Sequence, residues 1–440
     1  MSVNQFIKPI TTQRQNNLMI GGCDLVELAK KYKTPLYVID ETTLRTVCKE
    51  YKEGFKNYPN IRMTYASKAL CNLAISKILT QEGFGFDVVS AGEIYTVHKS
   101  GADMSKVTFN GNNKSEEELN LALDLDIGVF SVDNFLEAAR LNMLAERKNK
   151  MANILLRITP GIECHTHEYI KTGQIDSKFG FDLHQIDSII TLVKEKYNNL
   201  NLKGLHAHIG SQVCEPDCYN DELEILINEL VRINKKFGLN LNEINIGGGL
   251  GVKYTESDTP LSVSDFCKNI TNSIDQLLNK SSIKDLVIYI EPGRSIVSTS
   301  GVTLYTVGSS KKVTNGRKYV AIDGGMADNP RPAMYKANYS TELANSAQDR
   351  PNEVVTIAGR YCESGDVLIE NIELPELHAG DILCVYNTGA YNYSMASNYN
   401  RVGKPAMVLV NNSQSDIIVN RESLEDLVAL DSIPDRLNKE

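Results

Sequence analysis

The chain has 440 residues, which exceeds one average domain, so it can bury a large core and form one large domain with a smaller one. Its formal net charge of −9, without any long run of Lys or Arg, argues against nucleic acid or an anionic membrane surface as the main partner. No apolar stretch has membrane-spanning length, and the polar residues 1–17 do not resemble a signal peptide. Nine cysteines, an odd number, fit free thiols in a reducing compartment, so we expect a soluble, cytoplasmic protein that acts on small molecules.

Residues 1–22 show little periodicity, which predicts a partly ordered arm. Apolar residues at helical spacing then predict an amphipathic helix over 25–32. Residues 35–40 predict a strand, and Asp40 at its end is placed to cap the helix that follows.

From residue 61 to residue 293, short β-rich runs alternate with segments of helical period. Eight such units in roughly 250 residues are typical of a TIM barrel. A doubly wound open sheet is the alternative, but its phosphate-binding glycines should follow the first strand, whereas here they follow the seventh. Strands are predicted over 61–66, 84–90, 107–111, 128–133, 153–160, 202–210, 241–249 and 285–293, and helices over 119–123, 135–144, 186–193, 223–233 and 266–278.

After residue 300 the sequence becomes turn-rich with a period of two, which predicts an all-β second domain. The strand near residue 37 precedes the barrel and could join this domain. We therefore expect an α/β TIM barrel over 41–299 and a β domain over 300–440 that also takes in the N-terminal segment 1–40. The acidic tail after residue 423 predicts a short helix and a frayed end.

The active site of a TIM barrel lies at the carboxyl ends of its strands. Lys68 follows the first predicted strand, His208 ends the sixth, Gly247 to Gly249 end the seventh, and Glu291 lies at the end of the eighth. A lysine flanked by small residues at a strand end is accessible, and burial can lower its pKa until the neutral amine is a usable nucleophile. Taken alone, Lys68 would more often be a solvated lysine.

The glycines at 247, 248 and 249 leave consecutive backbone N–H groups unhindered, and the loops after strands seven and eight often bind phosphate in this fold. In a plainer interpretation, these glycines only allow a tight turn. A phosphate site that faces an accessible lysine suggests pyridoxal phosphate (PLP), whose aldehyde forms a Schiff base with the lysine. Glu291 is placed to keep the pyridine nitrogen protonated, and His208 to lie flat against the ring, although a lone histidine is more often part of a core.

Two pairs of residues could suggest a metal ion, Cys214 with Cys218 and His165 with His167. The cysteine pair has no second pair nearby, and the histidines have no carboxylate partner. We therefore predict no metal site.

Nine motifs follow one another along the chain, at residues 65–69, 110–114, 165–180, 208–212, 247–251, 291–295, 331–335, 362–366 and 388–391. Such a set of motifs in this order is very specific. On these motifs the chain resembles, over residues 35–400, the diaminopimelate decarboxylases, PLP-dependent enzymes with a barrel and a β domain. Ala91 and Arg360 depart from the usual pattern, but neither is the lysine or a substrate-binding position.

The resemblance implies that Lys68 holds PLP, that His208 stacks on its ring and that Glu291 binds the ring nitrogen. Cys362 would protonate the carbanion and Glu363 would bind substrate, both reaching across the interface of a homodimer with shared active sites. The implied phosphate ligands are Ser211, Gly247, Gly248, Gly249, the backbone of Gly293 and Arg294, and Tyr391.

The implied reaction is decarboxylation of meso-2,6-diaminopimelate to L-lysine and CO2, the last step of lysine biosynthesis. This substrate carries an amino acid at both ends, so its distal group is a zwitterion that needs cations and an anion in the receptor. Arg294, Arg331 and Tyr335 can bind its carboxylate and Glu363 its ammonium, with Tyr391 as a further ligand. In plainer interpretations Arg331 belongs to a surface turn and Cys362 is a small buried hydrophobe.

Other functions compete with this prediction. A decarboxylase of the same fold for arginine, ornithine or carboxynorspermidine is the nearest rival. A catalytically silent PLP-binding protein is disfavoured because both Lys68 and Cys362 are present, and a racemase because no second tyrosine base is evident. The length and position of the 164–179 loop suggest a lid.

Overall fold

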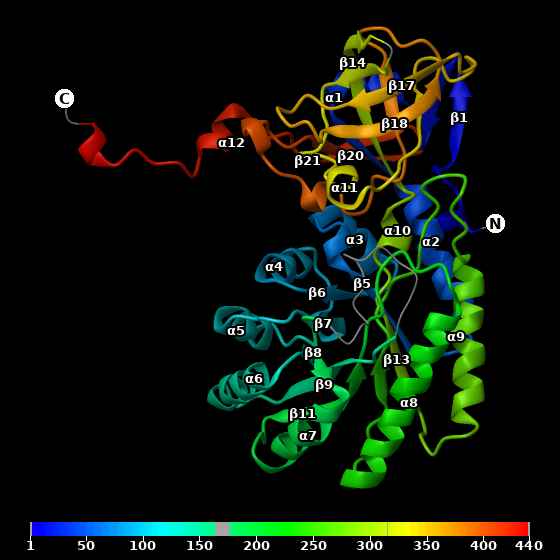
Figure 1. Ribbon diagram of the computed structural model, residues 1–440. Helices are drawn as coiled ribbons and strands as arrows, with labels where there is room; N and C mark the ends of the chain where they lie inside the picture. Colours follow the sequence, from blue (N-terminus) through cyan, green and yellow to red (C-terminus); the bar gives the residue numbers. More distant parts are fainter. Residues whose placement is uncertain (1, 163–176, 315, 439–440) are drawn as a thin grey trace. The chain divides into compact units, whose positions relative to one another are not determined.

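The computed structural model describes residues 2–162, 177–314 and 316–438, and the chain divides into two compact units (Figure 1). Unit 1 comprises Met1–Phe6 and Leu44–Ser298, and unit 2 comprises Ile7–Thr43 and Thr299–Glu440. Most of the predicted lid, with His165 and His167, lies outside the described residues.

Unit 1 contains a closed barrel of eight parallel strands, which confirms the TIM barrel and rules out the open sheet. Neighbours pair in the order β5-β6-β7-β8-β9-β11-β12-β13, and the pairing of Ile288 in β13 with Ile61 in β5 completes the ring. A two-residue strand, β10 (Phe181–Asp182), adds to β9. The barrel strands are β5 (Ile61–Ala66), β6 (Gly85–Val88), β7 (Val107–Phe109), β8 (Val129–Val132), β9 (Ala152–Thr159), β11 (Leu200–His206), β12 (Glu243–Asn245) and β13 (Val287–Ile290).

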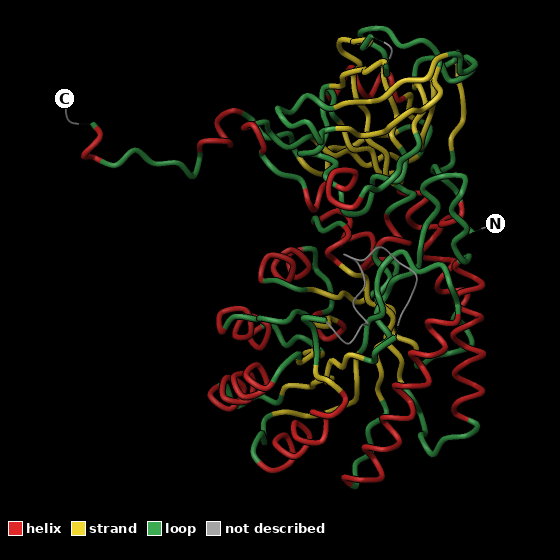
Figure 2. Tube along the Cα trace, viewed as in Figure 1, coloured by secondary structure: helices red, strands yellow, loops and turns green. Residues whose placement is uncertain are grey.

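Helices lie around these strands in unit 1, as Figure 2 shows. Several begin at side-chain caps, because an Asn or Ser oxygen accepts a hydrogen bond from an N–H of the first turn that has no partner within the helix. Ser90, Asn134 and Ser262 cap α4, α6 and α9 in this way. The helices are α2 (Glu41–Gly54, with residues from Leu44 on in this unit), α3 (Leu73–Gln81), α4 (Ala91–Lys99), α5 (Glu116–Asp124), α6 (Phe135–Arg147), α7 (Ile186–Glu195), α8 (Asp217–Phe237), α9 (Val263–Leu278) and α10 (Arg294–Val297).

The seventh strand is much shorter than the predicted 241–249, because β12 spans only Glu243–Asn245. The glycines that follow explain the difference. Gly247 and Gly249 have φ angles of +63° and +113°, which an extended strand does not adopt. The predicted strand therefore ends in a loop at the carboxyl end of the barrel.

Unit 2 is built around β4 (Leu36–Asp40), so the strand near residue 37 does join the β domain, as predicted. Strand β14 pairs with it antiparallel and β20 pairs with it parallel, in the sheet order β18-β17-β15-β14-β4-β20-β21. The remaining strands and helices are β14 (Gly301–Lys312), β15 (Lys318–Ile322), β16 (Thr341–Leu343), β17 (Glu353–Ala358), β18 (Val367–Leu374), β19 (Ile382–Val385), β20 (Ala406–Asn411), β21 (Gln414–Val419), α1 (Leu25–Tyr32), α11 (Arg331–Tyr335) and α12 (Leu424–Val428).

The N-terminal residues are more ordered than the sequence predicts. Three short strands, β1 (Thr11–Arg14), β2 (Asn17–Ile20) and β3 (Cys23–Asp24), form a sheet of their own. Leu18 and Ile20 are buried in the core of unit 2, so tertiary contacts stabilise a segment whose local pattern is weak. Asp40 accepts hydrogen bonds from the N–H groups of Thr42 and Thr43, which confirms its predicted role as a cap.

Within the described residues, no helix combines the length and apolar character needed to cross a bilayer.

Candidate active site at the carboxyl ends of the barrel strands

Lys68 lies just beyond the end of β5, in a single 3-10 turn over Ser67–Ala69. Its neighbours Ser67 and Ala69 are buried, whereas Lys68 itself is exposed. The amine therefore lies on the accessible side of the strand end, as predicted. Its positive charge lowers the pKa values of the nearby His208 and His206, in addition to the larger effect of their burial.

Glu291 follows β13 and is buried with only 6% of its surface exposed. Its Oε1 accepts hydrogen bonds from Asn245 Nδ2 at 2.7 Å and from Asn110 Nδ2 at 3.0 Å. Burial raises the pKa of this carboxyl, the nearby Asp87 raises it further, and the charge of Lys68 opposes both effects. A cationic partner would stabilise the ionised form, which is what a protonated ring nitrogen supplies.

The glycines after β12 are required by close packing. A Cβ atom at Gly247 would lie 2.5 Å from His208 Nδ1, and one at Gly248 would lie 2.1 Å from the carbonyl oxygen of Glu291. The Gly247 carbonyl accepts a hydrogen bond from the Glu291 N–H at 2.7 Å, and the Gly248 N–H donates to His208 Nδ1 at 3.4 Å. The glycine loop therefore brings His208 and Glu291 to one place.

Arg294 begins the short helix α10 and is buried. Its guanidinium donates to Ser211 Oγ at 2.8 Å and to Tyr254 Oη at 2.7 Å. A buried arginine beside the glycine loop and Ser211 provides positive charge where the sequence predicts a phosphate. The structure thus brings together the predicted residues Ser211 and Arg294, and it adds Tyr254.

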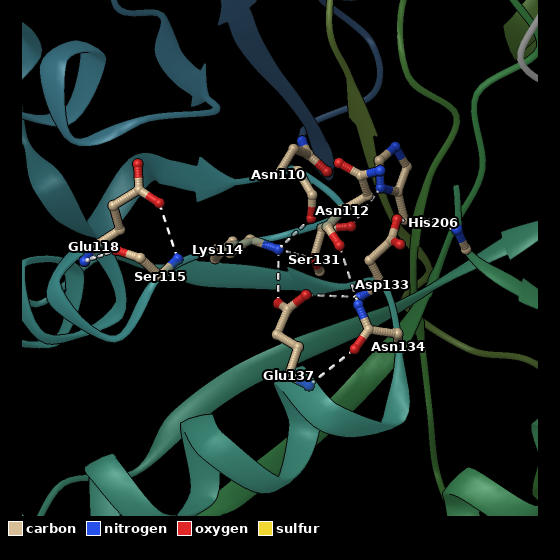
Figure 3. Close-up of polar contacts among 12 residues, drawn as sticks. Asn110, Asn112, Lys114, Ser115, Glu118, Ser131, Asp133, Asn134, Glu137 and His206 are labelled. Atoms are coloured by element: carbon tan, nitrogen blue, oxygen red, sulfur yellow. Dashed lines mark hydrogen bonds and ion pairs between the residues drawn. The ribbon is translucent and has the colours of Figure 1, made fainter. Parts of the chain in front are cut away.

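A network of polar side chains around Lys114 and Glu137 lies at the strand ends (Figure 3). Lys114 and Glu137 form an ion pair at 2.6 Å whose side chains are only 1% and 3% exposed. Lys114 also donates to the carbonyl oxygens of Gly111 and Ser131, each at 2.8 Å. The Ser131 hydroxyl in turn lies 2.6 Å from His206 Nδ1.

The remaining predicted residues belong to unit 2. Arg331 is buried in α11 and donates to Tyr339 Oη at 2.7 Å, and Tyr335 ends the same helix. Cys362 and Glu363 are exposed neighbours on a turn, where the Cys362 N–H donates to Asn400 Oδ1 at 2.9 Å. The exposure of Cys362 argues against its plainer interpretation as a buried hydrophobe. Tyr391 is half-buried and has a positive φ of 61°, which is uncommon for a residue with a side chain.

The residues of unit 1 fit PLP. An accessible amine, a buried carboxylate with defined acceptor geometry, and a glycine loop that tolerates no Cβ are the features that its aldehyde, ring nitrogen and phosphate need. None of these three features requires a metal ion.

Comparisons with known proteins agree with this site. The family model described as "Pyridoxal-dependent decarboxylase, pyridoxal binding domain" matches residues 44–298. Diaminopimelate decarboxylases from Synechocystis sp. and Bacillus subtilis are each 45% identical to the chain. These alignments cover 99% and 96% of the chain, and 95% and 97% of the two relatives. The chain belongs to the diaminopimelate decarboxylase family.

Solved structures of diaminopimelate decarboxylases have the same fold. The enzyme from M. jannaschii in co-complex with L-lysine has a TM-score of 0.91 and 35% identity, over 99% of this chain and 100% of that one. The Helicobacter pylori enzyme complexed with L-lysine has a TM-score of 0.84 and 33% identity, over 92% of this chain and 99% of that one. The predicted family, fold class and PLP dependence are therefore confirmed.

Four residues without a predicted role lie at the site. Asn110 and Asn245 bind Glu291, His206 lies 3.7 Å from it, and Tyr254 binds Arg294. Asn110, His206 and Asn245 are polar residues at the ends of apolar strands, and that position is the signal that could have identified them. Tyr254 has no such signal, because it lies in a loop.

Proposed function

We propose that this decarboxylase uses Lys68 to hold PLP and Cys362 to deliver the proton that replaces the departing carboxylate. As a member of its family, the protein is a PLP-dependent amino-acid decarboxylase that converts meso-2,6-diaminopimelate to L-lysine and CO2, the last step of lysine biosynthesis. The observation that carries the residue assignment is the buried Glu291, held by two asparagines beside the glycine loop.

Bound PLP supplies an electron-withdrawing ring that accepts the electron pair left when the bond to the α-carboxylate breaks. Glu291 would keep the ring nitrogen protonated, because an ionised carboxylate in a buried site favours a cation as its neighbour. His208 would contact the ring. The phosphate would be bound by Ser211, the glycine loop, the Gly293 and Arg294 backbone, and Tyr391.

Lys68 would hold the cofactor through its side-chain amine between turnovers. The Cys362 thiol would supply the proton that takes the place of the departing carboxylate, so the product differs from the substrate by one carboxylate replaced by one hydrogen. The thiolate that remains must regain a proton before the next turnover.

The distal end of the substrate is recognised by both signs of charge. Arg294, Arg331 and Tyr335 bind its carboxylate, and Glu363 binds its ammonium. Because Cys362 and Glu363 are exposed on unit 2, we further propose that they act in the barrel of a second copy, in a cytoplasmic homodimer with shared sites.

The absorption spectrum of the purified protein tests these assignments, recorded before and after meso-diaminopimelate while CO2 release is followed. Wild-type protein should show the visible band of lysine-bound PLP, change on substrate addition and release CO2. Lys68→Ala should show no such band and no turnover. Near-normal turnover by Lys68→Ala would sink the assignment.

Arg331→Ala separates diaminopimelate from rival substrates. The variant should lose activity on diaminopimelate, because the distal carboxylate loses its bidentate partner. Lysine and ornithine should then be tested as substrates of both proteins. Activity on either of them by the wild-type protein, unaffected by the substitution, would favour a decarboxylase for another amino acid.

A further inference from the structure

The two carboxylate oxygens of Glu291 have different polar neighbours. Among the described residues, Asn110 and Asn245 both donate their side-chain hydrogen bonds to Oε1 of the carboxylate. Oε2 faces His206 Nε2 at 3.7 Å. His206 is only 1% exposed, and within the described part of the chain its Nε2 has no hydrogen-bond partner. A buried imidazole nitrogen in that position is costly unless the carboxylate is its partner.

The orientation of His206 is fixed from the opposite side of its ring. Ser131 Oγ lies 2.6 Å from His206 Nδ1, and Ser131 is completely buried in β8 (Figure 3). Burial lowers the pKa of His206 well below its ordinary value, and the positive charges of Arg157, Lys68 and Lys114 lower it further. The ring is therefore neutral, with one N–H and one lone pair.

A hydroxyl group can either donate or accept, so Ser131 is compatible with both tautomers of this ring. When Ser131 donates to Nδ1, the ring directs its Nε2–H at Glu291 Oε2 and favours the ionised carboxylate. When Ser131 accepts from Nδ1–H, Nε2 offers a lone pair to a protonated carboxyl. One pair of residues can thus hold Glu291 in both protonation states.

Lys114 anchors the whole arrangement. Its ammonium donates to the backbone oxygen of Ser131 and to that of Gly111, the residue next to Asn110. Glu137 neutralises the charge of Lys114 within the barrel. The same ammonium therefore fixes the strand that carries the Ser131 hydroxyl and the loop that carries the Asn110 amide.

We propose that His206, oriented by Ser131, is a positioning residue for the ring-nitrogen carboxylate Glu291. The inference rests on the proposed role of Glu291 and adds a partner for its second oxygen. It predicts that a polar atom at the Nε2 position of residue 206 strengthens PLP binding, and that a side chain that only fills the same volume does not.

Two substitutions at residue 206 separate these effects. Asn in His206→Asn can replace Nδ1 and keep the contact with Ser131, but it has no atom at Nε2. Gln in His206→Gln can place an amide N–H near the Nε2 position. We expect His206→Asn to weaken PLP binding by about threefold to tenfold, because Glu291 Oε2 loses the polar group that faces it at 3.7 Å, and His206→Gln to stay within about twofold of wild type.

The measurements are a titration of cofactor-depleted protein with PLP, followed by the visible band, and steady-state kinetics. In His206→Asn, kcat should fall with little change in KM for diaminopimelate, because Glu291 contacts the cofactor and not the substrate. Unchanged PLP binding and kcat in His206→Asn would overturn the proposal. Equal losses in His206→Asn and His206→Gln would also overturn it, because they would mean that residue 206 acts only through packing.

Ser131→Ala provides an independent test if the variants at residue 206 fold poorly. It removes the hydroxyl with little change in volume, so we expect PLP binding to weaken about threefold. Wild-type affinity in Ser131→Ala would contradict the orienting role. Failure of the proposed function gives a different result, because wild-type protein itself would then show no band on addition of PLP.

Discussion

Glu291 and Arg294 of unit 1 are buried and joined to neighbouring side chains by hydrogen bonds, whereas Cys362 and Glu363 of unit 2 lie exposed on a turn. The first pair is held in place by its own barrel. The second pair consists of a thiol and a carboxylate that are both exposed. The difference shows that unit 1 fixes its buried groups by its own hydrogen bonds. The proposed roles of Cys362 and Glu363 would require a further protein surface, such as that of the proposed homodimer, to exclude water.

The largest expected effect is that of Cys362→Ala. Loss of the proton donor should lower kcat by about a thousandfold, within the range for general acid catalysis. Binding of PLP and the urea midpoint should not change, because the side chain is exposed. Ser364→Ala, an exposed neighbour on the same turn, is the matched control. Wild-type kcat in Cys362→Ala would remove the thiol from the mechanism.

Breaking the buried ion pair tests how firmly the barrel holds its site. Lys114→Met should destabilise the protein by about 3–5 kcal/mol, because it leaves the Glu137 carboxylate buried without a partner. Lys114→Met combined with Glu137→Leu should recover most of the loss. In unit 2, Lys318→Met removes a partly exposed pair with Glu353 and should cost about 1 kcal/mol or less. Urea unfolding of wild type and the three variants gives their free energies of unfolding. Equal losses of stability in Lys114→Met and Lys318→Met would contradict the contrast between the units.

Glu291→Gln sharpens the role of the carboxylate. The amide keeps the size of the side chain but not its charge, so kcat should fall by about a hundredfold and PLP should bind more weakly. Glu222→Gln is the control, because Glu222 is also a buried carboxyl, in α8, that the proposed mechanism does not use. Similar losses of activity in the two variants would mean that any substitution of a buried carboxyl disturbs the barrel.

Glu222 should also make stability depend on pH. Within the described residues its two carboxyl oxygens have no hydrogen-bond partner, and burial raises its pKa well above the ordinary value, with Glu291 adding to the effect. The unfolded chain ionises this group near a pKa of about 4.3, whereas the folded protein keeps the proton at higher pH. The folded state then binds more protons, so this contribution to stability falls as pH rises above about 4.3 and stops falling above the folded pKa.

The comparison between wild type and Glu222→Gln isolates this effect. Between pH 5 and pH 7, the stability of wild type relative to the variant should decrease, by at most about 2.7 kcal/mol, since each unit of pH contributes at most about 1.4 kcal/mol. Urea unfolding of both proteins at the two pH values provides the numbers. A difference that does not change with pH would show that Glu222 is ionised in the folded protein.

The sequence alone determined the features that depend on local pattern. The alternation of strands and helices predicts the barrel, Lys68 is recognisable by its place at a strand end, and the three glycines at the end of strand seven predict a phosphate-binding site. The motifs of the family identify the chemistry, because they combine residue type with order along the chain. None of these inferences requires knowing which residues meet in space.

Only the tertiary structure decided which polar groups meet. Asn110, Asn245 and His206 are far apart along the chain, and they converge on Glu291 because barrel closure brings the carboxyl ends of their strands together. The three-stranded sheet over residues 11–24 likewise forms because Leu18 and Ile20 are buried by distant strands. Pairings of this kind follow from the closed barrel and the packed core, and no local pattern encodes them.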